Sequence, residues 1–220
     1  MRLFLSPKKK VPIIGANKRE YYVWQFYSIL WDYFAIKNWK AKNQLIEKKG
    51  DLETYQIDGQ RVTFTPHHWS VFFREWNRQW KKYYLPNFDL NGKTVLDVGA
   101  GCGETILFYL SHGAARVIAI EPDSTAFKIL KENSETNNWP VELYNEPLNR
   151  KHLELRFDFA KLDCEGGESL LFDYLPNVEI ALEAHSSEII QRLGKLGFSV
   201  SKSLGPELAL MKNWEEAVRS

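Results

Sequence analysis

Three glycines at alternate positions follow an apolar segment near the middle of the chain. The apolar segment ends in Asp97 and Val98, and Gly99, Gly101 and Gly103 come directly after it. Glycines at such positions allow a tight turn and let a ligand approach the backbone closely. The next residues favour a helix, whose first N–H groups are unpaired and attract an anionic group. The segment therefore predicts a ligand site between a strand and a helix.

An acidic residue at the end of the next apolar segment narrows the choice of ligand. Glu121 lies 22 residues after Gly99, where a carboxylate can accept hydrogen bonds from both hydroxyls of a ribose. A dinucleotide site would need a third glycine at the position that Glu104 occupies. A carboxylate at the start of the helix suits a pyrophosphate poorly, so the pattern favours a nucleoside ligand of another kind.

The pattern Asp-x-Gly-x-Gly-x-Gly resembles the first motif of S-adenosylmethionine-dependent methyltransferases. The resemblance implies S-adenosyl-L-methionine as the cofactor and a Rossmann-like class I methyltransferase fold. It makes Glu121 the ribose ligand, and it lets Asp97 orient the loop or reach the amino end of the cofactor. Asn145 and Glu146, after the third strand, are placed to flank the adenine. The cofactor-binding residues that we expect are Asp97, Gly99, Gly101, Gly103, Glu121, Pro122, Asn145, Glu146 and Asp163.

A second acidic segment, Asp163-Cys164-Glu165-Gly166-Gly167-Glu168, follows a later apolar strand. It resembles the Asp-x-Glu-Gly-x-Glu motif of FkbM-type methyltransferases, and 180–185 looks like that family's fifth strand. The resemblance covers about 93–212 and implies O-methylation of a hydroxyl on a sugar or small molecule. No Asn/Asp-Pro-Pro-Tyr/Phe motif, which serves methylation of exocyclic amines, follows the strand.

Two residues are candidates for the catalytic base. A hydroxyl becomes a good nucleophile only when a positioned group within hydrogen-bond reach accepts its proton. Asp163 and His185 end two strands at the carboxyl edge of the expected sheet, where ligands bind. His185 could equally begin a loop, and Asp163 could cap the next helix. Glu165 and Glu168 could join Asp163 around Mg²⁺, but ordering the glycine turn is their favoured role, and we expect no metal.

From Lys93 onward, short strands alternate with helices, which is the pattern of a parallel sheet. The expected strands are 94–99, 116–121, 141–145, 159–163, 179–183, 198–203 and 207–212. The expected helices are 104–112, 124–137, 168–174 and 187–195. The fold class is therefore α/β, with a mostly parallel seven-stranded sheet in a domain spanning 93–220.

The first 92 residues form a mainly helical extension in this interpretation. Asn17 and Glu20 resemble a capping box and predict a helix to about Lys49. A hairpin of strands at 52–57 and 61–65, around an Asp-Gly turn, should follow.

A further helix in this extension should begin after the hairpin. Thr65 looks like its N-cap, with Pro66 at the first helical position. Trp69, Phe72 and Trp76 belong to one aromatic stripe along it, which is more often core than a ligand platform.

The net charge of +1 conceals two oppositely charged parts. Residues 1–93 carry 17 Lys and Arg against 8 Asp and Glu, and the remainder carries 12 against 20. The two parts could simply attract each other, or the basic part could meet an anionic substrate or nucleic acid. The acceptor that we expect is a small molecule or glycan. The alternatives are an RNA methyltransferase that uses the basic part and a non-catalytic cofactor-binding module.

Cysteine content and hydropathy limit the expected location of the protein in the cell. Two cysteines, Cys102 and Cys164, build no disulfide framework, so a reducing cytoplasmic location is expected. The most apolar region, 21–39, is interrupted by Gln25, Asp32 and Lys37 and predicts no membrane span. The sequence does not indicate an oligomeric state.

Overall fold

A computed structural model describes residues 4–5, 12–13, 44–76, 80–164, 166–174, 176–205 and 208–213. The chain divides into two compact units, Met1–Leu45 and Ile46–Ser220. In the first unit, β1 (Phe4–Leu5) and β2 (Pro12–Ile13) pair as antiparallel strands. The helix predicted from Asn17 lies outside the described residues as far as residue 43.

The described part of the N-terminal region consists largely of strands, so the expectation of a mainly helical extension is wrong. β3 (Gln44–Lys49), β4 (Leu52–Ile57) and β5 (Gln60–Phe64) form a three-stranded sheet in that order. The end of the helix predicted to reach Lys49 is therefore a strand. Every residue of β3 is exposed, so backbone pairing with β4 specifies this strand and apolar periodicity does not reveal it.

The predicted hairpin is confirmed. β4 and β5 are antiparallel, with Ile57 opposite Gln60. Asp58 and Gly59 both have positive φ, of 47° and 82°, which a two-residue hairpin turn of type I′ requires. The helix after the hairpin is confirmed as well: α2 (Pro66–Glu75) follows Thr65, whose side chain accepts a hydrogen bond from the backbone N–H of His68.

The aromatic side chains of this region form core. Phe64 and Phe72 lie 5.2 Å apart between ring centroids, and both are buried. The short helix α3 (Lys81–Tyr83) follows Trp80, whose ring lies 5.6 Å from that of Phe108. The packing interpretation of the aromatic stripe is therefore supported.

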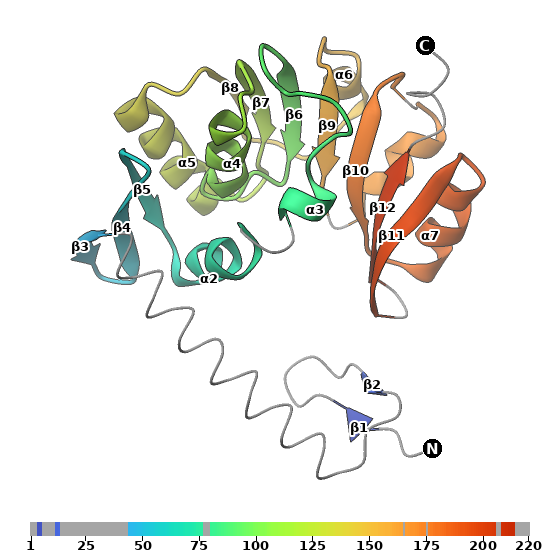
Figure 1. Cartoon of the computed structure of the whole chain (residues 1–220), viewed down its shortest axis with the longest axis horizontal. Coiled ribbons are helices and arrows are strands. Elements are labelled where there is room, and N and C mark those ends of the chain that lie inside the picture. Colours follow the sequence, from blue (N-terminus) through green and yellow to red (C-terminus); the bar gives the residue numbers. More distant parts are fainter. Residues whose placement is uncertain are drawn as a thin grey trace. The chain divides into compact units, whose positions relative to one another are not determined.

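A seven-stranded sheet forms the centre of the second unit (Figure 1). Its strands are β6 (Thr94–Val98), β7 (Arg116–Ile120), β8 (Val141–Tyr144), β9 (Phe159–Leu162), β10 (Glu179–Ala184), β11 (Phe198–Gly205) and β12 (Leu208–Asn213). Their order is β11-β12-β10-β9-β6-β7-β8, and β12 pairs antiparallel with both of its neighbours. The predicted mostly parallel seven-stranded sheet is confirmed.

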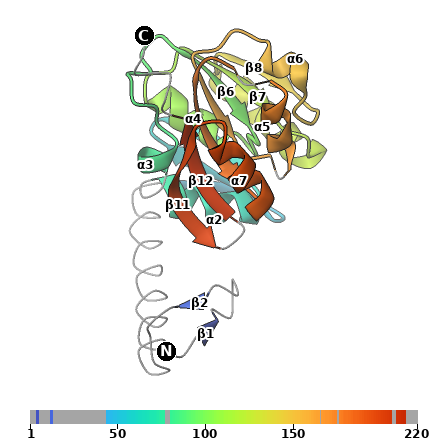
Figure 2. The same cartoon turned by 90° about the vertical axis from the view of Figure 1, so that its right-hand side faces the viewer.

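Helices and one 3-10 segment connect these strands. They are α4 (Glu104–Ser111), α5 (Ser124–Asn137), α6 (Arg150–Leu153), η2 (Gly167–Phe172) and α7 (Ser187–Gly194). Figure 2 looks at the sheet from the end where β11, β12 and α7 lie. The helix predicted at 168–174 is a 3-10 helix. No helix among the described residues is long and apolar enough to cross a membrane.

The connection order places a switch point in the middle of the sheet. The chain runs outward from β6 through β7 to β8, and then returns to place β9 on the other side of β6. The connections leaving β6 and β9 therefore diverge at their carboxyl ends, which is where ligands bind in open α/β sheets.

Two asparagines of α5 fix the hairpin to the sheet domain. The Asn133 side chain accepts from the Thr63 N–H at 2.8 Å and donates to the Thr63 carbonyl at 2.9 Å. The Asn137 side chain makes the same two bonds with Arg61, both at 2.9 Å. The amides thus satisfy the free edge of β5 as a neighbouring strand would. The predicted domain boundary at residues 92 and 93 stays a prediction.

Candidate active site

The glycine loop joins β6 to α4 in a left-handed conformation. Gly99, Gly101 and Gly103 have φ values of +75°, +57° and +97°. A Cβ at Gly99 would lie 2.1 Å from the carbonyl oxygen of Asp163, at the end of β9. The ends of the two central strands therefore meet backbone to backbone, and only glycine fits between them.

Asp97 lies beneath the loop and is fully buried. It accepts a hydrogen bond from the hydroxyl of Thr105 and lies 3.3 Å from the ammonium of Lys161. Burial raises the pKa of Asp97, and the Lys161 charge opposes that shift. Because Lys161 also donates to the carbonyls of Val98 and Gly99, at 3.0 and 2.8 Å, the pair holds the loop from below. Of the two roles predicted for Asp97, this geometry agrees with orienting the loop.

Glu121 lies directly after β7. Its carboxylate accepts one hydrogen bond from the Gly101 N–H and one from the Asp123 N–H, both at 2.8 Å. Burial raises the pKa of Glu121, while these two bonds oppose the shift. Each carboxylate oxygen has a second lone pair, so both can still accept a bond from a ligand hydroxyl.

Two adjoining cavities lie above the glycine loop. The larger, of 440 Å³, falls within the size range of small-molecule sites. The smaller has 140 Å³. Both cavities are lined by His67, His68, Gly99, Glu121 and Asp163. The larger is also lined by Pro122, Asp123, Leu148 and Cys164, and the smaller by Trp80, Tyr84, Glu104 and Lys161.

The residues predicted to flank an adenine are engaged with their own chain. The Asn145 amide donates to the Glu121 carbonyl at 2.8 Å. Glu146 pairs with Lys151 at 2.8 Å and with His152 at 3.2 Å. The next two residues, Pro147 and Leu148, line the larger cavity instead. Asn145 therefore supports the Glu121 turn, and the adenine contacts of both residues stay predictions.

The structure brings the two candidate bases together. His185 Nε2 lies 3.5 Å from an oxygen of Asp163, and its Nδ1 lies 2.5 Å from an oxygen of Glu168. The hydrogen bond that His185 donates to Glu168 raises the pKa of His185, and the charge of Asp163 adds to this effect. Burial raises the pKa of Glu168, but the hydrogen bond to His185, the charge of His185 and backbone hydrogen bonds together outweigh burial and lower it. His185 thus lies between two carboxylates that favour its protonated form.

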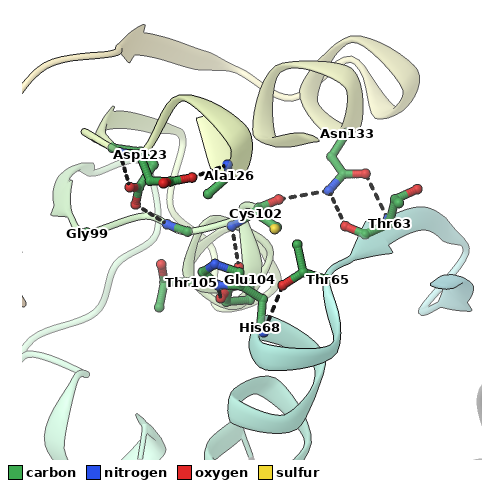
Figure 3. Close-up of polar contacts among 12 residues, drawn as sticks. Thr63, Thr65, His68, Gly99, Cys102, Glu104, Thr105, Asp123, Ala126 and Asn133 are labelled. Atoms are coloured by element: carbon green, nitrogen blue, oxygen red, sulfur yellow. Dashed lines mark hydrogen bonds and ion pairs between the residues drawn. The ribbon is translucent and has the colours of Figure 1, made fainter. Parts of the chain in front are cut away.

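His68, at the start of α2, is a site residue that the sequence analysis missed. Its Nδ1 lies 2.6 Å from Glu104, which also accepts from the Cys102 N–H at 2.8 Å (Figure 3). The two residues are 36 positions apart in the chain, so no local sequence pattern could predict their contact. The sequence analysis also missed Lys161, for a different reason. Lys161 lies inside β9, whose neighbouring residues are apolar and predict a buried core strand.

The cysteines do not act as nucleophiles in this geometry. Burial raises the pKa of the Cys164 thiol to about 12 and raises that of Cys102 further still. The potential ligand atoms of His68, Cys102 and Glu104 lie within 4.8 Å of one another. A neutral thiol and a carboxylate that already accepts two bonds make this cluster a poor metal site. Glu165 of the predicted acidic motif lies outside the described residues.

Comparisons with known proteins agree with this geometry. Residues 72–158 match the family model "Conserved hypothetical protein 95". The ribosomal protein L11 methyltransferases of Citrobacter koseri and Salmonella newport are 43% identical over 63 residues, which is 28% of this chain. The match spans only 22% of the length of each relative. The solved structure of P. horikoshii TYW2 in complex with MeSAdo has a TM-score of 0.50 at 18% identity, covering 79% of this chain and 74% of that one.

The fold is therefore the Rossmann-like class I methyltransferase fold, and the matched 63-residue segment is similar to curated methyltransferases. The predicted enzyme class and cofactor are confirmed. The resemblance to FkbM-type enzymes is not supported, since the matching family model is a different one and the curated relatives named above are ribosomal protein methyltransferases.

Proposed function

We propose that this chain transfers a methyl group from S-adenosyl-L-methionine to a base of RNA. The main observation that supports methyl transfer is the arrangement of residues at the carboxyl ends of β6, β7 and β9. There the glycine loop, Glu121 and Asp163 surround the two cavities. Two exposed lysines on α3, which lies beside the smaller cavity, favour RNA as the acceptor.

The donor set of the larger cavity fits the nucleoside half of the cofactor. Glu121 can accept bonds from the ribose hydroxyls, and Leu148 and Ala126 provide apolar surface for a ring. A Cβ at Gly101 would meet His68 and Glu104 at 2.7 and 2.6 Å, so these two side chains pack directly against the loop and only glycine fits there. When bound, S-adenosyl-L-methionine supplies an electrophilic methyl group on a sulfonium.

The basic charge next to the site favours an anionic acceptor. Lys81 and Lys82 are exposed on α3, between Trp80 and Tyr84, which both line the smaller cavity. Phosphates pair with such a surface, and their contacts weaken steeply with salt.

Asp163 is the proton acceptor in this proposal. Its carboxylate lines both cavities and can accept a hydrogen bond from an N–H of the base. As the acceptor nitrogen forms its bond to the methyl carbon and the carbon–sulfur bond breaks, the proton passes to Asp163. His185 lies against Asp163 and orients it, while Glu168 holds His185 in place.

Methyl transfer from labelled S-adenosyl-L-methionine, offered total RNA and ribosomal protein separately, tests the proposal. We expect label in RNA, in a base after digestion to nucleosides. Asp163→Asn should lower the rate of methyl transfer about 100-fold, within the usual range for one acid–base group. Asp173→Asn, an exposed carboxylate after η2, is the matched control and should behave as the wild type.

Lys81→Ala with Lys82→Ala should raise KM for RNA and reduce the salt dependence of binding. Label in ribosomal protein with none in RNA would overturn the acceptor class. Cofactor binding without transfer to either would favour a non-catalytic binding module.

A further inference from the structure

The smaller cavity is lined by a preformed pair of a histidine and a carboxylate. His68 and Glu104 face each other across the glycine loop, with 2.6 Å between Nδ1 and the carboxylate oxygen. Their side chains are 22% and 6% exposed. Burial lowers the pKa of His68, but the hydrogen bond and charge of Glu104 outweigh burial and raise it. Glu104 thus favours the protonated form of His68, in which Nε2–H is a second donor.

The other cation in the lining of this cavity is committed elsewhere. Lys161 points its ammonium at the carbonyls of Val98 and Gly99 and at Asp97 beneath the loop. It is 1% exposed, so moving it toward a ligand would leave Asp97 buried without its partner. Lys161 is therefore not available to a carboxylate that enters the smaller cavity, and His68 is the cationic side chain that such a carboxylate can contact.

The two cavities together fit the two halves of the cofactor. The larger holds groups suited to a nucleoside, and the smaller adjoins it at Gly99 and Glu121 and contains charges of both signs. The far end of S-adenosyl-L-methionine is an amino acid, with one ammonium and one carboxylate. A pair of fixed opposite charges is the complement of such a zwitterion.

We propose that His68 and Glu104 bind the amino-acid end of the cofactor, with His68 on the carboxylate and Glu104 on the ammonium. This inference rests on the proposed function and assigns part of the cofactor site to α2, outside the sheet domain. Thr65 fixes the backbone of His68 by accepting its N–H at 3.3 Å. Asn133 bonds both Thr63 and the Cys102 carbonyl, so the two sides of the pair are braced against each other (Figure 3).

The test compares two ligands that differ only at that end. S-adenosylhomocysteine carries the amino acid, whereas methylthioadenosine keeps the nucleoside thioether and lacks it. His68→Asn should weaken S-adenosylhomocysteine binding about 10- to 100-fold, the range for a lost charge-assisted hydrogen bond, and leave methylthioadenosine binding unchanged. His112→Asn, at the opposite end of α4, is the matched control and should change neither affinity.

Glu104→Gln provides a second variant, because the amide oxygen can still accept from Cys102 while the charge is lost. It should show the same selectivity between the two ligands. Equal weakening of both ligands by the two variants would indicate a merely structural role and overturn the inference, as would no weakening of either. If the wild type binds neither ligand, the proposed function itself fails.

Discussion

Gly99→Ala is expected to destroy the cofactor cradle. The new methyl group would lie 2.1 Å from the Asp163 carbonyl oxygen, and φ at this position is +75°. Left-handed backbone costs a residue with a Cβ about 1–2 kcal/mol, and overpacking a tight site costs about 1–3 kcal/mol more. Both partners in the clash are backbone at the ends of β6 and β9, so neither can rotate away. We expect urea unfolding to show a loss of about 2–5 kcal/mol and calorimetry to show no cofactor binding.

Gly92→Ala separates the clash from the backbone strain. Gly92 has a φ of +74°, nearly that of Gly99, and nothing lies within 4 Å of its Cβ position. This variant should lose only the about 1–2 kcal/mol of backbone strain and should bind the cofactor normally. Equal stability losses in the two variants would show that the contact between β6 and β9 is not as tight as we describe.

Lys161→Met is expected to be the most damaging single change outside the glycine loop. It removes the ammonium from a fully buried pair and leaves the Asp97 carboxylate without compensation. Breaking such a pair costs about 3–5 kcal/mol. Because burial holds the pKa of Asp97 above its unfolded value, the folded variant gains stability as Asp97 becomes protonated. The loss should therefore be smallest at low pH and grow as the pH rises through the folded-state pKa of Asp97.

The double variant Lys161→Met with Asp97→Asn provides the control. A neutral amide can still accept from Thr105 and no longer needs a buried cation. Urea unfolding should be measured for the wild type, Lys161→Met, Asp97→Asn and the double variant. We expect the double variant to recover part of the stability that Lys161→Met loses. If Lys161→Met alone unfolds at the wild-type urea concentration, the pair does not hold the loop.

Strand and helix positions in the sheet domain could be predicted almost residue by residue. The predicted strand at 116–121 is observed as Arg116–Ile120, and the helix predicted at 124–137 is observed at those residues. Both faces of a parallel sheet are covered, so its strands are short apolar runs that stand out between helices. The glycine loop was predictable for a different reason, since its conformation requires residues without a Cβ.

The parts that could not be predicted depend on contacts between distant segments. β3 is specified by pairing with β4, and its exposed side chains carry no periodic signal. His68 becomes a site residue only because Asn133 and Asn137 dock the hairpin against α5. The sequence pattern of residues 168–174 predicts an α-helix, but η2 begins at the second of two adjacent glycines and is wound more tightly.

Calorimetric titration with S-adenosyl-L-methionine and S-adenosylhomocysteine tests the account most directly, with NAD as the ligand control. Glu121→Ala is the test variant, and Glu142→Ala, whose carboxylate pairs with Arg116 at the surface, is the matched control. We predict that the wild type and Glu142→Ala bind both sulfur ligands and not NAD, and that Glu121→Ala binds none of them. Wild-type protein that binds neither sulfur ligand, or Glu121→Ala that binds both with wild-type affinity, would contradict the cofactor site described here.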